Sequence, residues 1–217
     1  MSVLSPEDFI RRHTVLAVPP LVPEISLHLA QAVIPLWEAM ERFLGRPNPP
    51  PPYWAFAWPG GQALARFVLD HPEHVSARHV VDFAAGCGIG AIAAAHAGAD
   101  GIVATDIDPL AQAAIRLNGE ANGRHHLAVT GDDATGRDEP VADVILAGDV
   151  CYEKPMAGKV LDWLRRQAAQ GVTVLLADPG RAYAPRESLD LLASYDVPVS
   201  QDVESTGIRT TRVWKLR

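Results

Sequence analysis

Three glycines and two aspartates form the pattern in this sequence with the clearest chemical meaning. The segment from Val80 to Gly90 reads VVDFAAGCGIG, a β-branched run followed by glycines at every second position. Such a segment predicts a strand that turns sharply into a helix, where backbone can approach a ligand closely and the helix offers unpaired N–H groups. Asp106 ends the next apolar run, and its carboxylate could accept both hydroxyls of a ribose. The pattern therefore predicts a nucleoside-containing ligand at the carboxyl edge of a sheet.

The glycine spacing leaves two cofactors open. Gly86, Gly88 and Ala91 satisfy the dinucleotide fingerprint G-x-G-x-x-G/A, which would make the protein a nicotinamide-dependent oxidoreductase. Asp82 favours S-adenosylmethionine, because a carboxylate before the glycines suits a cofactor with an ammonium group better than a pyrophosphate. A dinucleotide fold would also need a second mononucleotide-binding half, whereas this chain ends in a predicted hairpin.

A second polar group follows the strand predicted at Val141–Ala147. Asp149 and Tyr152 leave this strand at the same edge as the glycines, and an acid and a phenol that face a cofactor indicate a catalytic pair. The alternative is that Asp149 or Glu153 caps the helix predicted to begin near Pro155. One of Asp132 and Asp133 could likewise accept the adenine amine, or both could belong to a solvated turn.

Alternating strands and helices must position these residues. Strands are predicted at His79–Ala84, Gly101–Thr105, His126–Thr130, Val141–Ala147 and Val172–Ala177, with helices at Gln62–Asp70, Ile89–Ala97, Pro109–Asn122 and Pro155–Gln170. Because these strands lack a polar face, they indicate a parallel sheet covered on both sides. After a helix predicted at Pro185–Ala193, the extended segments Asp196–Glu204 and Arg209–Leu216 are predicted to pair as a hairpin. The fold class is α/β, Rossmann-like and doubly wound.

The N-terminal part lacks this alternation of strands and helices. Ser5 is a predicted helix cap, and Ile25–Leu44 is a helical segment interrupted by Pro35. A proline run then predicts a stiff connector, after which Trp54, Phe56 and Trp58 alternate with alanines. An extended backbone would present these three rings on one face. We expect residues 1–46 to form an N-terminal helical extension on the domain 47–217, within a single structural domain.

Composition excludes several functions. The 217 residues are 48% hydrophobic with a net charge of −7, so the chain is not disordered and is a poor binder of nucleic acid or anionic membrane. No signal peptide or membrane span is evident, and the lone pair Cys87 and Cys151 indicates reduced thiols in the cytoplasm. His71 and His74 lack a third ligand, so no metal is predicted. Nothing requires more than a monomer.

The residues from Asp82 to Gly90, followed by Asp106, resemble the class I, seven-stranded S-adenosylmethionine-dependent methyltransferases. Three further segments are similar to a narrower group, the lysine methyltransferases that act on the β-subunit of electron transfer flavoprotein. These segments are WAFAWPGG at 54–61, DVCY at 149–152 and DPGR at 178–181. That group is itself similar to bacterial methyltransferases of ribosomal proteins. The resemblance implies seven strands, mostly parallel, with a C-terminal antiparallel hairpin.

The resemblance also implies a role for each matching residue. Gly86, Gly88 and Gly90 would wrap the methionine part of S-adenosylmethionine, and Asp82 would support that loop and the ammonium. Asp106 would hold the ribose and Ile107 would pack on the adenine. Asp132 would meet the adenine amine, with Asp133 as the alternative, and Trp58 would line the pocket from the N-terminal side. Asp149 and Tyr152 match the D-x-x-Y signature that faces the incoming lysine.

The resulting expectation is a protein-lysine methyltransferase acting on electron transfer flavoprotein β-subunit and on a ribosomal protein as a further candidate. A methyltransferase of a small molecule or RNA, and an NAD-dependent oxidoreductase, are the alternatives. A lysine must lose a proton before it can attack, and burial among Trp54, Phe56 and Tyr152 would lower its pKa. Asp149 would raise that pKa instead. We therefore expect Asp149 to capture and orient the lysine, and leave open whether it relays the proton.

Overall fold

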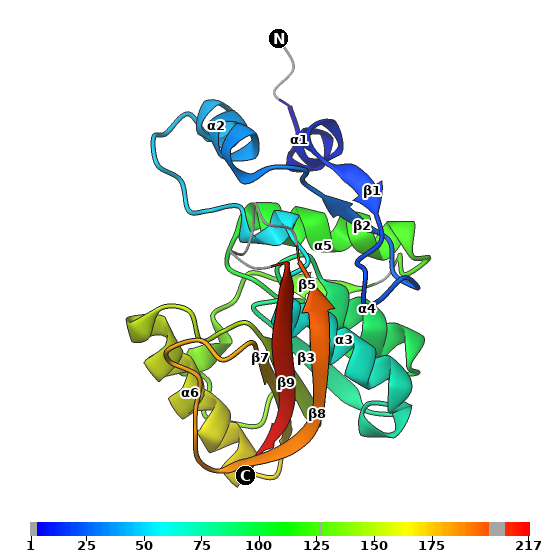
Figure 1. Cartoon of the computed structure of the whole chain (residues 1–217), viewed down its shortest axis with the longest axis vertical. Helices are drawn as coiled ribbons and strands as arrows, with labels where there is room; N and C mark the ends of the chain where they lie inside the picture. The colour runs from blue at the N-terminus through cyan, green and yellow to red at the C-terminus, as the bar shows by residue number, and fades with distance from the viewer. Residues whose placement is uncertain (1–3, 126, 200–206) are drawn as a thin grey trace.

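A seven-stranded sheet forms the centre of the molecule, in the strand order β5-β4-β3-β6-β7-β9-β8 (Figure 1). The computed structural model describes residues 4–125, 127–199 and 207–217. The strands are β3 (His79–Phe83), β4 (Gly101–Thr105), β5 (Ala128–Thr130), β6 (Val144–Gly148), β7 (Thr173–Asp178), β8 (Leu189–Pro198) and β9 (Ile208–Leu216). The first five are parallel, whereas β9 runs antiparallel to both β7 and β8. This arrangement confirms the predicted fold class.

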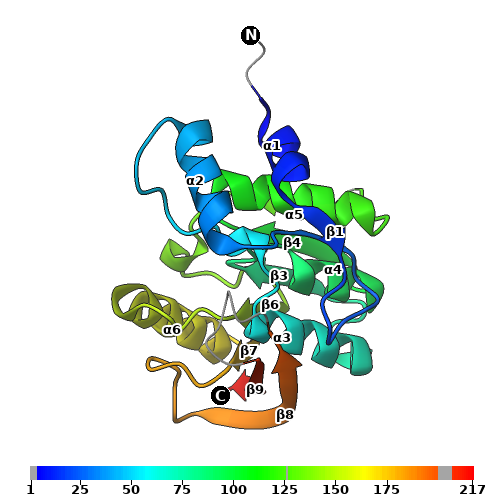
Figure 2. The same ribbon diagram turned by 45° about the horizontal axis from the view of Figure 1, so that its top comes forward.

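Both faces of the parallel strands are apolar, which is why helices cover both. Alternate residues such as Val80, Val144 and Leu175 face α3 (Pro59–Asp70) and α4 (Ile89–His96). The intervening residues, such as Val81 and Ile145, face α6 (Lys154–Ala169). Helix α5 (Pro109–Ala121) lies beside α4, and Ile115 of α5 joins a core cluster with Ala91 of α4 and Ala104 of β4. Figure 2 shows α6 on one side of the sheet and α3, α4 and α5 on the other.

The N-terminal segment packs against α5. It contains α1 (Pro6–His13), the antiparallel pair β1 (Val15–Ala17) and β2 (Leu27–Leu29), and α2 (Val33–Leu44). Ser5 accepts a hydrogen bond from the backbone of Asp8, which confirms the predicted cap. The helix predicted from Ile25 is wrong in its first part, because residues 27–29 pair with β1. Pro35 lies in the first turn of α2, where a helix has no use for its missing N–H.

Two asparagines of α5 fasten this segment to the rest of the molecule. The buried Asn118 accepts a hydrogen bond from the backbone N–H of His28, at 2.7 Å, and donates one to the carbonyl of Cys87, at 2.8 Å. Asn122 makes two hydrogen bonds to the backbone of Ser26. Strand β2 and the glycine loop are therefore held by the same helix.

The alternating aromatic segment is extended at Phe56 and Trp58 but not at Trp54. Residues Tyr53–Ala55 form a 3-10 turn, with backbone hydrogen bonds from Tyr53 to Pro51 and from Ala55 to Pro52. Trp54 and Phe56 are only 1% and 7% exposed and join a core with α1, α2 and α5. Burial of Trp54 against the N-terminal helices outweighs the extended geometry that the alternation favours.

The helix predicted at Pro185–Ala193 is also wrong, because β8 begins at Leu189 and pairs with β9. Pairing across the hairpin, which extends from Leu189–Leu216 to Pro198–Ile208, overrides the local preference of the Leu-rich segment. Parts of two predicted strands, His126 and residues 200–204, lie outside the described residues.

Candidate active site

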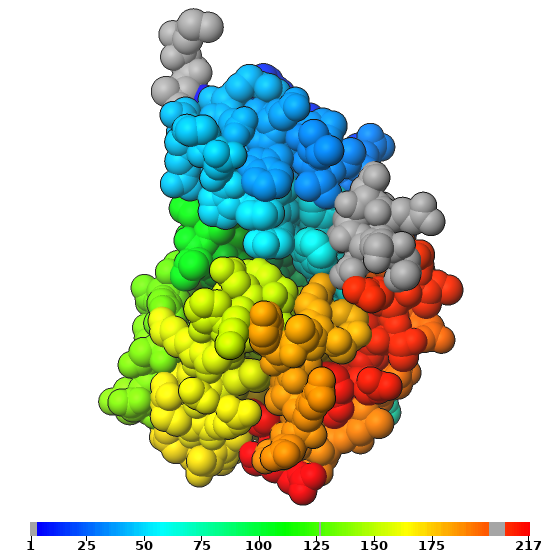
Figure 3. All heavy atoms as spheres, turned by 60° about the vertical axis from the view of Figure 1, so that its left-hand side comes forward, coloured from blue at the N-terminus to red at the C-terminus, as the bar shows by residue number. Residues whose placement is uncertain are grey.

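The polar residues singled out in the sequence gather at one edge of the sheet. Asp82 is in β3, Asp106 follows β4 and Asp149 follows β6, and these three strands are neighbours that run in the same direction. The chain passes from β3 to β4 on one side and later to β6 on the other, so the strand order reverses there. Ligands of open α/β sheets bind at such a reversal. In Figure 3 the blue-to-cyan N-terminal third lies above the yellow-green residues that follow β6.

The glycine loop depends on backbone conformations and clearances that suit glycine. Gly86 and Gly88 have φ values of +53° and +78°, in the left-handed region. A Cβ at Gly90 would lie 2.8 Å from Oδ1 of Asp82. Asp82 is buried, its Oδ2 accepts a hydrogen bond from the N–H of Ala91 at 2.7 Å, and burial raises its pKa to about 7. Asp82 therefore fastens the start of α4 to the end of β3.

Asp106 connects the loop to the second strand. Its Oδ2 accepts a hydrogen bond from the N–H of Gly86 at 2.9 Å, and its Oδ1 accepts one from the N–H of Asp108 at 3.0 Å. Burial raises the pKa of Asp106. A carboxylate oxygen can accept more than one hydrogen bond, so these contacts leave capacity for ribose hydroxyls. The next residue, Ile107, is 74% exposed and offers an apolar surface beside that carboxylate.

The two acids after β5 have different surroundings. Oδ1 of Asp133 accepts hydrogen bonds from both the N–H and the hydroxyl of Thr135, and its Oδ2 pairs with Lys159 at 2.7 Å. The hydrogen bond from Lys159 is the largest of the effects that lower the pKa of Asp133 to about 2. Asp132 pairs through Oδ2 with Arg137 at 3.1 Å and is exposed. Asp132 therefore keeps more acceptor capacity for an adenine amine than Asp133 does.

Asp149 lies at a junction between β6, β7 and α3. Its Oδ2 accepts a hydrogen bond from the N–H of Gly61 in the first turn of α3, at 2.9 Å, and its own N–H donates to the carbonyl of Ala177. Asp149 thus binds the first turn of α3, and the alternative in which it caps the helix near Pro155 is not observed. Glu153 occupies the cap position of α6 but makes no side-chain capping hydrogen bond.

The junction has no room for side chains on its glycines. A Cβ at Gly60 would lie 2.6 Å from both Oδ2 of Asp149 and the carbonyl oxygen of Ala177. A Cβ at Gly148 would lie 2.9 Å from the backbone nitrogen of Gly61. The Pro-Gly-Gly sequence that begins α3 and the Gly-Asp sequence at the end of β6 therefore fit against each other in one contact. Asp149 itself has a φ of +59°, a conformation that non-glycine residues adopt rarely.

Arg181 pairs with Asp149, a contact that the sequence reasoning missed. Its Nη1 forms an ion pair with Oδ1 of Asp149 and lies 3.7 Å from Oδ2 of Asp178. Its guanidinium carbon lies 5.9 Å from the ring centroid of Trp58. Burial raises the pKa of Asp149, which is opposed by the charge of Arg181. The signal available in the sequence was an arginine placed just after a predicted strand at this same edge.

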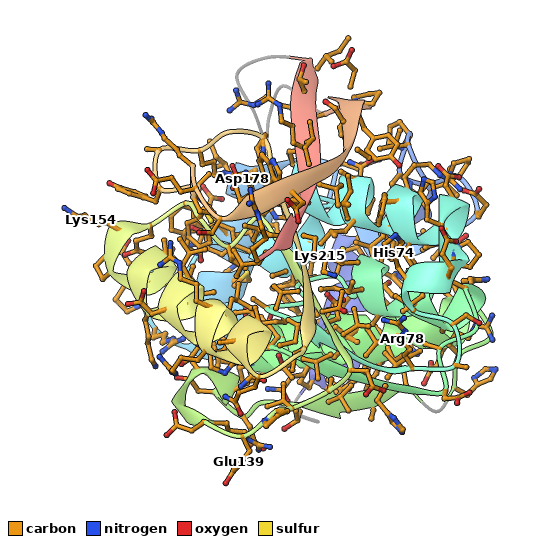
Figure 4. All side chains as sticks on the ribbon, turned by 90° about the horizontal axis from the view of Figure 1, so that it is seen from below. His74, Arg78, Glu139, Lys154, Asp178 and Lys215 are labelled. Carbon is orange, nitrogen blue, oxygen red and sulfur yellow. The ribbon has the colours of Figure 1, made fainter. Side chains whose placement is uncertain are left out.

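Asp178 holds the loop that carries this arginine. Its Oδ1 accepts hydrogen bonds from the N–H groups of Gly180 and Arg181, at 2.7 and 2.6 Å. Its Oδ2 is buried and has no hydrogen-bond partner among the described residues. Figure 4 shows Asp178 inside the molecule, whereas Lys154 at the start of α6 points outward. The arginine is thereby presented to the edge of the sheet by a buried carboxylate.

Three aromatic side chains stand at the mouth of the site. The ring of Tyr53 lies 5.1 Å from that of Tyr152 and 5.8 Å from that of Trp58, measured between centroids. Trp58 donates a hydrogen bond from Nε1 to the carbonyl of Tyr53, at 2.8 Å. Tyr53 and Tyr152 are each 39% exposed. The prediction that Trp54 and Phe56 line a lysine channel is wrong, because both are buried, and Tyr53 lies at the mouth instead.

Burial strongly affects three titratable side chains near this edge, two thiols and one phenol. Burial raises the pKa of Cys87, of Cys151 and of Tyr152 to about 12 in each case, so all three stay protonated at neutral pH. Within the described ranges, no group of three or more His, Cys, Asp and Glu residues could hold a metal ion. No helix in the same ranges is both long and apolar enough to span a membrane.

The geometry fits S-adenosylmethionine at three points. A Cβ at Gly86 would meet no atom closer than 3.9 Å, so the glycine loop leaves space there; Asp106 keeps acceptor capacity for a ribose, and Ile107 is an exposed apolar surface for a flat base. Strand order, glycine loop and carboxylates together define a class I, S-adenosylmethionine-dependent methyltransferase.

Comparison with known proteins refines this class. Residues 63–150 match the family model of the ribosomal protein L11 methyltransferase. The electron transfer flavoprotein β-subunit lysine methyltransferase of Xenopus laevis is 39% identical over 99% of this chain and 88% of its own length. The Homo sapiens protein of that name is 35% identical over 98% of this chain and 83% of its own length. The chain belongs to the electron transfer flavoprotein β-subunit lysine methyltransferase family, and it is an S-adenosylmethionine-dependent protein-lysine methyltransferase.

Solved structures agree on the fold. The magnesium protoporphyrin IX methyltransferase of Synechocystis PCC 6803, solved with bound SAM, superposes with a TM-score of 0.54 at 16% sequence identity. The matched region spans 72% of this chain and 79% of that chain. The ribosomal protein L11 methylase of Lactobacillus delbrueckii covers 73% and 78% with a TM-score of 0.51 at 19% identity. At these identities the likeness concerns the fold alone.

Proposed function

We propose that this chain methylates lysine side chains of electron transfer flavoprotein β-subunit, with a ribosomal protein as a further candidate substrate. The observation that carries the proposal is the identity of 39% to the Xenopus laevis methyltransferase over nearly the whole of both chains. The match of residues 63–150 to the ribosomal protein L11 methyltransferase model supports the second candidate. The two buried free thiols, Cys87 and Cys151, support a reducing compartment such as the cytoplasm.

The residues proposed to hold the cofactor lie at or just after the ends of β3, β4 and β5, or just before α3. Gly86, Gly88 and Gly90 would lie along its methionine part, and Asp82 would keep that loop in place. Asp106 would accept the ribose hydroxyls, while Ile107 and Asp132 would meet the adenine. Trp58 would close the pocket from the side of α3. S-adenosylmethionine, when bound, supplies an activated methyl group on a positively charged sulfur.

Asp149 and Tyr152 are proposed to receive the lysine. Asp149 lies at the carboxyl end of β6 with its carboxylate fixed by Gly61 and Arg181, so it can accept a hydrogen bond from the amine in a defined direction. Tyr152 and Tyr53 supply partly exposed rings along which the lysine stem can pack. Holding two reactants in a productive geometry can contribute about 7–11 kcal/mol to catalysis. Positioning by these side chains is therefore expected to supply most of the acceleration.

The proposal is tested by incubating the protein with recombinant electron transfer flavoprotein β-subunit or ribosomal protein L11 and tritiated S-adenosylmethionine. We expect label in one of these proteins, and mass spectrometry should place it on lysine. The matched control is the same substrate with its lysines blocked by acetylation beforehand, which leaves an amide nitrogen that cannot attack the methyl group. Label that persists in the blocked substrate would contradict lysine methylation, and absence of label in both proteins would contradict the proposed substrates.

A further inference from the structure

The structure contains an apparent conflict between the charge of Asp149 and the reaction. A lysine must be bound as the free amine in order to react, yet a carboxylate next to it stabilises the ammonium. Asp178 is a second buried carboxyl group nearby, since its Oδ2 lies 3.7 Å from the same guanidinium nitrogen that pairs with Asp149. Burial raises the pKa of Asp178, and the hydrogen bonds and charge of Arg181 oppose that rise. Two carboxylates without a cation would hold the lysine in its unreactive form.

Arg181 supplies the missing positive charge. Its side chain is 15% exposed, and those of Asp149 and Asp178 are 12% and 0% exposed, so solvent screens these charges little. The Trp58 ring lies beside the guanidinium and keeps water from that side. We propose that Arg181 is a positioning residue that offsets the negative charge of Asp149 and Asp178, so that the incoming lysine is bound as the free amine.

Among the described residues, five further titratable groups interact with Asp149 or Tyr152 or lie beside them. They are Tyr53, Cys87, Asp106, Cys151 and Glu153. Burial raises the pKa of both thiols and of Tyr53 and Tyr152, so these four stay neutral. Asp106 and Glu153 add negative charge, which makes the contribution of Arg181 more necessary. The proton that the lysine loses passes to solvent at the partly exposed mouth.

Arg181 also holds the carboxylate in place. One oxygen of Asp149 is fixed by the Gly61 N–H and the other by Arg181, so the side chain cannot rotate without breaking one of two contacts. A guanidinium can pair with Asp149 and remain near Asp178 because the Asp178 carboxylate binds the backbone of Arg181. The arginine therefore acts on the lysine through Asp149, with no need to touch it.

The test is the pH dependence of single-turnover methyl transfer to the substrate protein in three variants. Arg181→Gln removes the positive charge, and Arg181→Lys retains it. Asp178→Asn removes one negative charge and keeps an oxygen that can accept from Gly180 and Arg181. A neighbouring charge shifts a pKa by about 1–3 units at close range. In Arg181→Gln we expect the acid limb of the rate–pH profile to shift to higher pH by about one unit. The rate of methyl transfer should then be about tenfold lower than that of the wild type at pH 7 and equal to it at high pH.

Arg181→Lys should bring the limb back toward that of the wild type, and Asp178→Asn should move it to lower pH. The matched control is Arg165→Gln, which removes an exposed arginine of α6 that pairs with Asp162 at 3.0 Å and should change nothing. Thermal unfolding and S-adenosylhomocysteine binding verify that each variant is folded. If Arg181→Gln does not fold, the direction in which the acid limb shifts in Asp178→Asn tests the inference by itself.

Equal losses at every pH in Arg181→Gln, or an unshifted limb in Asp178→Asn, would overturn the inference. The inference rests on the proposed function, and the two can fail separately. A wild-type protein that methylates neither substrate contradicts the proposed substrates, whereas an active wild type with unshifted variants contradicts only the role of Arg181.

Discussion

Replacement of Gly60 by alanine tests the junction between α3 and Asp149. The added Cβ would lie 2.6 Å from Oδ2 of Asp149, 2.7 Å from its backbone nitrogen and 2.6 Å from the carbonyl oxygen of Ala177. Overpacking of this kind costs about 1–3 kcal/mol, and loss of the charged hydrogen bond to Gly61 costs about 1.5–3 kcal/mol. Alanine returns about 0.5–1 kcal/mol through its helix preference. The net loss of unfolding free energy is about 3 kcal/mol.

The change is measured by urea unfolding and by the melting temperature. For a chain of this size about 1 kcal/mol corresponds to about 2–4 °C, so the melting temperature should fall by roughly 6–12 °C. The matched control is Gly158→Ala in α6, where an added Cβ meets no atom within 4 Å and should stabilise the protein slightly. A Gly60→Ala protein as stable as the wild type would refute the steric reasoning.

Three further predictions concern the carboxylates and the glycine loop. Asp149→Asn removes the charge but keeps an acceptor for the Gly61 N–H. Methyl transfer should therefore fall by about 100-fold while S-adenosylhomocysteine binding, measured by calorimetry, is unchanged. Asp149→Ala should in addition lose the hydrogen bond to Gly61, worth about 1.5–3 kcal/mol of stability, and weakened S-adenosylhomocysteine binding in the Asn variant would contradict a role confined to the lysine. Gly90→Ala would place a Cβ 2.8 Å from Asp82 and should weaken S-adenosylhomocysteine binding by at least about tenfold, and unchanged binding would show that the loop tolerates a side chain. Asp82 has a folded pKa of about 7 against an ordinary 3.8, so its contribution to stability is present below pH 3.8 and is lost as pH rises through 7. Asp82→Asn should therefore unfold at higher urea than the wild type at pH 8 and not at pH 4, and the same difference at both pH values would contradict the raised pKa.

The sequence predicted the sheet because local patterns determine it. The parallel strands are apolar on both faces, and Gly86, Gly88 and Asp106 form contacts with residues close to them in the chain or in the neighbouring strand. The β8 segment could not be predicted in the same way, since its conformation depends on pairing with β9. Local preference favoured a helix there, and hydrogen bonds to a distant strand decided the outcome.

The part of the site that sequence reasoning missed consists of contacts between distant residues. Asp149 meets Gly61 and Arg181, which are far from it in opposite directions along the chain. No local pattern shows that Gly60 must lack a side chain because a carboxylate lies against it. The burial of Trp54 likewise depends on the N-terminal helices, whose packing a short alternating motif does not encode.

Asn118 has a consequence for how this enzyme can be recombined with its relatives. Its side-chain amide accepts a hydrogen bond from the N–H of His28 and donates one to the carbonyl of Cys87, so this position needs both a donor and an acceptor. An aspartate could only accept from the His28 N–H and a lysine could only donate to the Cys87 carbonyl, so either one would leave the other backbone group without its hydrogen bond. A chimaera that takes its N-terminal segment from another methyltransferase must therefore keep a carboxamide at position 118, because a replacement that cannot both donate and accept would disturb the loop from Gly86 to Gly90.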